Sequence, residues 1–126
     1  MTTAFALPRR FLVNLASVAC LSLVVAAPAA AATLKVGLSV PLTGVQAGLG
    51  KEAEAVWRAF AKHGNDNRLL GQHTIDILVA DDAFDAGRAK ANAEALTKQG
   101  ALVMSGTAGI PTVQAMLPIL EKQKVP

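Results

Sequence analysis

Strand-like and helix-like apolar patterns alternate three times along residues 33–126, and this order constrains the fold more than any other feature of the sequence. Residues 34–40 and 74–80 have strand-like patterns, and residues 101–105 form a short apolar run. A stretch with helical spacing follows each of them. Because strands that alternate with helices assemble into a parallel sheet covered on its faces, we predict an α/β fold of three layers. Ligands of such sheets bind at the carboxyl ends of the strands.

The first helix is predicted at residues 50–63, where five apolar side chains recur at helical spacing and make one stripe. These side chains are Ala53, Val56, Trp57, Phe60 and Ala61. Gly64, Asn65 and Asn67 follow and tolerate left-handed backbone conformations. We therefore expect the helix to end among them.

The other two helices carry clear start and stop signals. The second is predicted to begin after an N-cap at Asp85 and to stop at Gly100. Pro111 opens the third, because proline suits the first turn of a helix. Pro118 lies inside this third helix and removes one backbone hydrogen bond, so we expect a kink or a break between two short helices near Met116.

Residues 1–32 have the pattern of a secretory signal peptide. Two arginines and no acidic residue precede an almost wholly apolar run at 11–27, and four alanines at 29–32 supply the small residues that a signal peptidase needs. We predict cleavage near Thr33, a periplasmic or secreted protein, and a fold formed by residues 33–126.

Three other interpretations of this leader remain open. An uncleaved membrane anchor would need roughly 20 apolar residues, and this run is shorter and contains Asn14. Cys20 would be the modified residue of a lipoprotein, although Ser17 stands where such signals usually have leucine. Arg9 and Arg10 ahead of the apolar run resemble a twin-arginine export signal.

The charge balance argues against a nucleic-acid partner. Two of the 12 basic residues lie in the leader, which leaves ten basic and nine acidic residues in the remainder. The single cysteine of the chain, Cys20, also lies in the leader, so residues 33–126 have no thiol for a disulfide or a thiolate metal site.

A phosphate-binding loop is suggested by Gly44, Gly48, Gly50 and Lys51 but does not match. The motif needs four residues between its first glycine and the Gly-Lys pair, and a hydroxyl residue after the lysine for a magnesium ion. Glu52 stands at that last position, where its carboxylate would repel the phosphates. The dinucleotide-binding glycine pattern is absent as well, so the sequence predicts no nucleotide cofactor.

The acidic residues Asp81, Asp82 and Asp85 follow the second predicted strand. Their spacing does not fit a calcium loop, and we interpret them as residues of a strand-to-helix turn. Metal binding or acid–base catalysis is the alternative. His63 and His73 have no acid or cysteine at ligand spacing and are interpreted as turn residues. No nucleophile with a plausible base emerges, so the sequence predicts no catalytic residues, no metal site and no enzyme.

Several segments together resemble the amino-terminal lobe of type I periplasmic binding proteins, and most closely the branched-chain amino-acid binding proteins of ABC importers. The segments are residues 35–44 (KVGLSVPLTG), 69–71 (LLG), 81–85 (DDAFD), 106–112 (GTAGIPT), 117–118 (LP) and 125–126 (VP). Asn67 and Arg68 depart from the family pattern, which usually has two glycines at these positions.

The resemblance implies one lobe of a two-lobed clamshell with the flavodoxin-like strand order, which captures a small solute without cofactor or catalysis and presents it to a membrane permease. The last residues of the chain have the pattern of a helix that ends just before a further strand, so we expect residues 33–126 to be a truncated lobe. The positions that match the family's ligand contacts are Thr107, Ala108, Gly109 and Thr112, with Leu42, Thr43 and Phe84 nearer the rim.

Alternatives to this assignment stay open. Thr107 and Thr112 are also explained as loop and cap residues. The same lobe occurs in proteins that bind amides, urea or aromatic acids, and in sensor domains. A flavodoxin-like or dinucleotide-binding enzyme is the alternative from another functional class.

Overall fold

The computed structural model describes residues 30–106 and 108–126. The predicted leader up to residue 29, including Cys20 and both arginines of the export signal, lies outside the described residues. The elements are β1 (Thr33–Val40), α2 (Ala47–Asp66), β2 (Thr74–Asp81), α3 (Ala86–Lys98), β3 (Val103–Ser105) and α4 (Ile110–Gln123).

The three strands form one parallel sheet in the order β2-β1-β3. β1 is the central strand: Val40 pairs with Asp81 of β2 on one side, and Leu38 pairs with Ser105 of β3 on the other. The predicted parallel sheet and its flavodoxin-like strand order are confirmed. Because all strands run in one direction, the loops that follow them meet at one edge of the sheet, called the carboxyl edge below.

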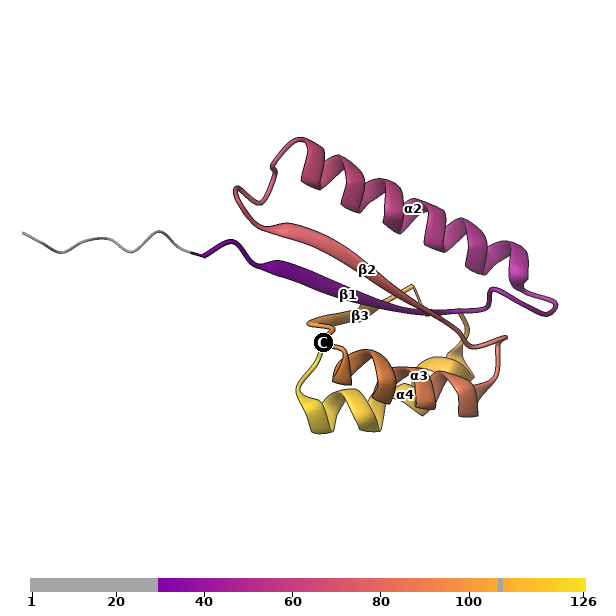
Figure 1. Ribbon diagram of the computed structural model, residues 1–126. Helices are drawn as coiled ribbons and strands as arrows, with labels where there is room; N and C mark the ends of the chain where they lie inside the picture. The colour runs from indigo at the N-terminus through magenta and orange to yellow at the C-terminus, as the bar shows by residue number, and fades with distance from the viewer. Residues whose placement is uncertain (1–29, 107) are drawn as a thin grey trace, which may run out of the picture. The chain divides into compact units, whose positions relative to one another are not determined.

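Helices cover both faces of the sheet (Figure 1), which confirms the three layers: α2 lies on one face, and α3 and α4 lie on the other. Between α2 and the sheet, Leu38 and Val40 are fully buried, and Trp57 and Ala61 pack onto the same cluster. Burial of one such aliphatic side chain contributes about 1.5–3 kcal/mol. Val36, Leu38 and Val40 lie on one face of β1, and Gly37 and Ser39 between them are buried as well, because helices cover both faces of the sheet.

The second cluster joins α3 to α4. Ala89 and Ala93 of α3 are completely buried against Met116 and Leu120 of α4. Two alanines one turn apart let the helices approach closely, because no large side chain separates them. This contact holds α4 against α3.

Helix α2 is longer than predicted at both ends. It starts at Ala47 and continues to Asp66, so Gly64 and Asn65 are helical rather than terminal. The left-handed residue that follows the helix is Arg68, at φ 51°, whereas Asn67 has φ −92°. The reason is tertiary: the Asn65 side chain accepts from the Ile75 amide at 2.8 Å and donates to the Ile75 carbonyl at 2.9 Å, which holds the last helical turn against β2.

The apolar stripe of α2 is wider than the face that the sheet covers. Trp57 contacts the core, but Val56 and Phe60 remain 67% and 55% exposed. The Trp57 and Phe60 rings meet edge to face with their centroids 5.9 Å apart. Helical periodicity located the stripe and did not distinguish its buried from its exposed half.

Helix α4 is continuous from Ile110 to Gln123, so the expectation of two short helices separated by a break is wrong. Pro118 is exposed on its surface, and Met116 and Leu120 on either side of the proline are buried against α3. Packing on both sides of Pro118 thus compensates for the one missing backbone hydrogen bond. None of the helices among the described residues is long and apolar enough to cross a membrane.

Candidate ligand-binding site

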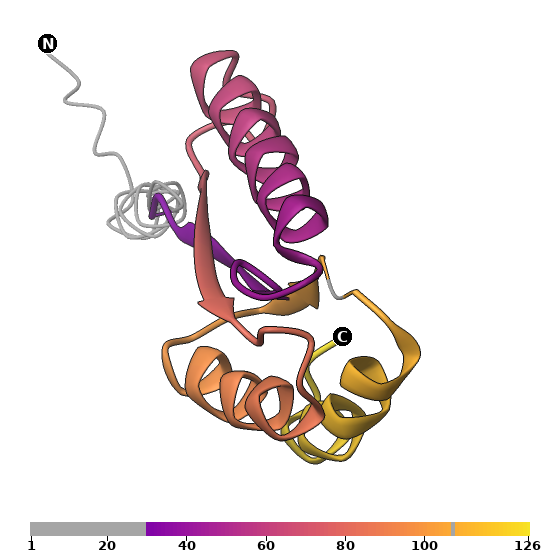
Figure 2. The same cartoon turned by 90° about the vertical axis from the view of Figure 1, so that its right-hand side faces the viewer.

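Three loops meet at the carboxyl edge of the sheet, and Figure 2 looks onto this edge. They follow β1, β2 and β3 and lead into α2, α3 and α4. Six of the seven predicted ligand-binding residues lie there within the described part of the chain, and Thr107 lies outside it. The six are Leu42, Thr43, Phe84, Ala108, Gly109 and Thr112.

The loops after β1 and β2 are joined by the carboxylate of Asp81. Its Oδ1 accepts hydrogen bonds from the amides of Leu42 (2.8 Å), Thr43 (3.2 Å) and Ala83 (2.9 Å), and its Oδ2 accepts from the Thr43 hydroxyl (2.6 Å). The hydroxyl bond, followed by the Ala83 amide, is the main cause that lowers the pKa of Asp81 from its usual 3.8 to about 2. The Arg88 guanidinium also lies 3.8 Å from this carboxylate. Asp81 is therefore ionised across the physiological range.

Asp82 makes a second, buried set of contacts beneath the same loop. Its Oδ2 accepts from the Ser39 hydroxyl at 2.9 Å, and its Oδ1 accepts from the Phe84 amide at 2.9 Å. The Asn92 side chain of α3 in turn donates to the Ser39 oxygen at 3.1 Å. A fully buried carboxylate thus connects β1, α3 and the backbone of Phe84.

Phe84 and Gly109 lie against each other across two loops. A Cβ placed on Gly109 would come 2.6 Å from Phe84 Cε2, so a side chain there would require the ring to move. Gly109 has φ 92°, and Phe84 itself has φ 64° after Ala83 at 47°. Two successive non-glycine residues in the left-handed region cost energy, and the hydrogen bonds that their amides donate to Asp81 and Asp82 compensate for it.

Thr112 holds the loop that precedes α4. Its side chain is completely buried, and its hydroxyl is positioned to donate to the carbonyls of Ala108 (2.7 Å) and Gly109 (2.8 Å). The hydroxyl therefore fixes the positions of Ala108 and Gly109. Of these three residues, Gly109 alone is exposed at the edge.

Asp81 and Asp82 accept the Ala83 and Phe84 amides in the strand-to-helix turn to which the sequence interpretation assigned them. That interpretation missed their second role, the hydrogen bonds that both carboxylates accept from β1 and the loop after it. The N-cap at Asp85 is confirmed, because its side chain accepts from the Arg88 amide at 2.7 Å. A signal for Asp81 did exist in the sequence. In a parallel pair of strands, the residues that end β1 and β2 become neighbours, which places Thr43 beside Asp81 although 38 positions separate them.

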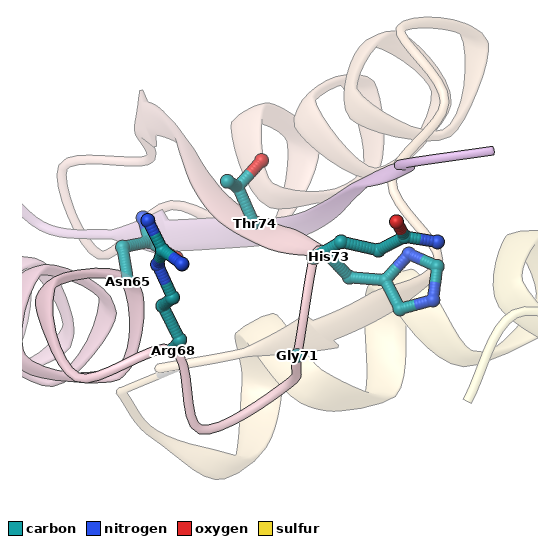
Figure 3. Close-up of a pocket in the computed structure, with 6 residues that line it drawn as sticks. Asn65, Arg68, Gly71, His73 and Thr74 are labelled. Atoms are coloured by element: carbon teal, nitrogen blue, oxygen red, sulfur yellow. The ribbon is translucent and has the colours of Figure 1, made fainter. Parts of the chain in front are cut away.

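Two hollows lie away from the carboxyl edge. One of about 530 Å³ opens at the start of β2 (Figure 3) and is lined by Asn65, Arg68, Gly71, Gln72, His73 and Thr74. The other, about 300 Å³, is apolar and is lined by Val56, Trp57 and Phe60 of α2. Neither includes any of the predicted ligand-binding residues.

The histidines and acids give no metal site in the described ranges. His73 Nδ1 accepts from the Ala32 amide at 3.1 Å, and His63 lies beside Asn67 at the end of α2. Among residues 30–106 and 108–126, no group of three or more His, Cys, Asp or Glu side chains is arranged to hold a metal ion.

Solved structures with the same arrangement are solute-binding proteins. A possible leucine/isoleucine/valine-binding protein from Rhodopirellula baltica SH 1 is 29% identical, with a TM-score of 0.73 over 80% of this chain and 28% of that one. A putative branched-chain amino acid ABC transporter protein from Rhodospirillum rubrum is 28% identical, with a TM-score of 0.67 over 77% of this chain and 28% of that one. A solute-binding protein of an ABC transporter from Rhodopseudomonas palustris BisB5, in complex with 3,4-dihydroxybenzoic acid, is 31% identical, with a TM-score of 0.66 over 75% and 26% of the two chains.

This chain therefore spans little more than a quarter of the length of the solved structures that it matches. A search of curated proteins gives no match to the sequence. The family model described as periplasmic binding protein matches residues 33–126, which is well over half of the chain. The resemblance seen in the sequence is confirmed: the chain belongs to the periplasmic binding protein family, in the type I group that includes the branched-chain amino-acid binding proteins of ABC transporters.

Proposed function

We propose that residues 33–126 form the ligand-binding part of an amino-terminal lobe in an extracytoplasmic substrate-binding protein, which captures a branched-chain amino acid or a similar small polar solute for an ABC importer. The observation that carries the proposal is the contact of Phe84 with Gly109 at the carboxyl edge, beside the Thr43 hydroxyl, in a chain of this family. Sheets of this kind bind ligands at that edge.

The chemistry of the edge suits a small solute with one apolar and one polar end. The Phe84 ring is 38% exposed and offers an apolar surface. Gly109 leaves its backbone open beside it, and the amides at the start of α4 are a favourable environment for a carboxylate. The proposal assigns no catalysis to this site, because its polar groups bind and orient rather than supply a nucleophile with a base.

An aromatic acid is the second candidate ligand, and Phe84 is the observation that favours it. An exposed aromatic ring can pack against a benzoate ring with a gain of about 0.5–1.5 kcal/mol beyond burial. The R. palustris relative, 31% identical to this chain, is in complex with 3,4-dihydroxybenzoic acid.

The rest of the proposed function follows from the family and the leader. The partner would be the membrane permease of an ABC importer, and the protein would act in the periplasm after removal of residues 1–32. Binders of amides or urea and sensor domains remain alternatives on the same fold.

The test is a nuclear magnetic resonance titration of the full chain with L-leucine and, separately, with 4-hydroxybenzoate at concentrations up to the millimolar range. We expect saturable shifts confined to Leu42, Thr43, Phe84 and Gly109. L-leucinamide and 4-hydroxybenzamide, which lack the carboxylate, are the matched controls and should bind more weakly. Shifts centred on Arg68 and His73 would place the site at the other end of the sheet, and the absence of saturable shifts with every compound would contradict the proposal.

A further inference from the structure

The Thr43 hydroxyl has one proton, and the structure shows where it goes. Thr43 Oγ1 lies 2.6 Å from Asp81 Oδ2, and an ionised carboxylate can only accept. The hydroxyl therefore donates to Asp81, and its lone pairs remain for other partners. Thr43 is exposed at the carboxyl edge, so it presents an acceptor there.

The backbone beside Thr43 depends on the same carboxylate. The amides of Leu42 and Thr43 donate to Asp81 Oδ1 from the loop after β1, and the amide of Ala83 donates to it from the loop after β2. Four donors thus converge on one side chain. An amide side chain could keep the three amide bonds only with its oxygen at the Oδ1 position, and its NH₂ group would then donate to Thr43 Oγ1, so that the hydroxyl no longer has to donate to residue 81.

The loop after β2 needs this support most. Ala83 and Phe84 both have positive φ angles, which non-glycine residues adopt at a cost. The hydrogen bond of the Ala83 amide to Asp81 stabilises the first of them, and the orientation of the Phe84 ring over Gly109 follows from this backbone.

We propose that Asp81 is a positioning residue of the binding edge: without touching the solute, it fixes the Thr43 hydroxyl as a hydrogen-bond acceptor and holds Thr43 and Phe84 in their relative places. The inference rests on the proposed function for its consequence in binding. It also predicts which solute group contacts Thr43. That group must be a hydrogen-bond donor, such as an ammonium, an amide N–H or a hydroxyl, and not a carboxylate.

The first experiment needs no ligand. In the full chain, Asp81→Asn is expected to raise the hydrogen-exchange rates of the Leu42, Thr43 and Ala83 amides several-fold, since a charge-assisted hydrogen bond becomes at best a neutral one at each. Asp76→Asn removes an exposed carboxylate from the same strand and should leave the three rates unchanged. Unchanged rates in Asp81→Asn would overturn the proposal.

A milder variant serves if Asp81→Asn fails to fold. Thr43→Val removes only the hydroxyl, which is the largest cause of the lowered pKa of Asp81, so the titration of the Asp81 carboxyl carbon should move to higher pH. A titration midpoint identical to that of the wild type would show that the hydroxyl proton is not held by Asp81, and would overturn the acceptor assignment.

The binding consequence is measured with L-leucine and 4-hydroxybenzoate as probes. Asp81→Asn is expected to weaken binding by about ten- to a hundredfold, and Asp76→Asn to leave it unchanged. Equal affinity in Asp81→Asn and wild type would overturn the role in binding. If neither probe binds the wild type, the proposed function fails for these solutes, while the exchange rates and the carboxyl titration still decide whether Asp81 positions the two loops.

Discussion

The Phe84 ring rests on the backbone of Gly109, so closely that a Cβ at position 109 would lie 2.6 Å from Cε2 and 2.7 Å from Cζ of the ring. This contact joins the loop after β2 to the loop before α4. Both residues have positive φ angles, at 64° for Phe84 and 92° for Gly109. The geometry of the carboxyl edge therefore depends on a glycine whose φ angle disfavours any side chain and on an aromatic residue that is held in an uncommon conformation.

Gly109→Ala is expected to destabilise the chain by about 1–3 kcal/mol, because the new Cβ meets the ring and the backbone angle disfavours a side chain. The cost should fall when the ring is absent, so Gly109→Ala should be less harmful in a Phe84→Ala background. Urea unfolding of the four chains of this double-mutant cycle measures the coupling. Additive effects within about 0.5 kcal/mol would show that the ring contact does not matter.

Thr112→Val is expected to lower the free energy of unfolding by about 1–3 kcal/mol. The substitution keeps the side-chain shape but removes the hydroxyl that is positioned to donate to the Ala108 and Gly109 carbonyls. Thr112→Ser retains the hydroxyl and should cost less. Thermal or urea unfolding tests both. Full stability of Thr112→Val together with a loss of solute affinity would indicate instead that the hydroxyl contacts the ligand directly.

Arg68→Gly is expected to stabilise the chain by about 0.5–1 kcal/mol, since Arg68 has φ 51° and glycine adopts that region without strain. Asn67→Gly is the contrasting variant: Asn67 has φ −92°, so glycine there relieves no strain, adds freedom to the unfolded chain and removes the side-chain hydrogen bond to the His63 carbonyl. Urea midpoints of the two variants should move in opposite directions. A lower midpoint for Arg68→Gly would mean that contacts of the arginine outweigh the backbone strain.

The stability that Asp81 contributes should depend on pH in the acid range. Its pKa in the folded chain is about 2, below the usual 3.8, so the ionised form is favoured by folding. That contribution is fully present well above pH 3.8 and is lost as the pH falls toward 2. The difference in unfolding free energy between wild type and Asp81→Asn should therefore narrow from pH 7 to pH 3. A difference that stays constant with pH would contradict the lowered pKa.

Export is predicted to leave Thr33 or a neighbouring residue as the mature amino terminus, because the alanines at 29–32 are the best cleavage site in the leader. Amino-terminal sequencing of exported protein tests this. An intact chain recovered from the membrane would support the anchor alternative, and a lipid on Cys20 would support the lipoprotein alternative. Export that persists when Arg9 and Arg10 are both changed to lysine would argue against the twin-arginine route.

Local sequence patterns were sufficient for the elements of this fold and their order. The period-two run of β1, the N-cap at Asp85 and the stop at Gly100 are properties of neighbouring residues, and the structure has each of them. Three strands separated by helices then allow little besides a parallel sheet with covered faces. The family resemblance added the strand order, since no local pattern encodes which strand lies in the middle.

Tertiary contacts decided what local patterns could not. Apolar residues recur at helical spacing both on the buried side of α2, at Ala61, and on its exposed side, at Phe60. Only packing against the sheet decides which of the two sides is buried. Pro118 predicts a kink or a break from its own chemistry, whereas α4 continues without a break because residues on both sides of it are buried against α3.

The binding edge itself is the clearest case. The sequence located Thr43, Phe84 and Gly109 in three separate loops, but no local pattern indicates that Asp81 accepts from Thr43 across 38 positions or that Phe84 covers Gly109. Such contacts form only when parallel strands bring their ends together, so they depend on the register of the sheet and not on the residues beside them in the chain.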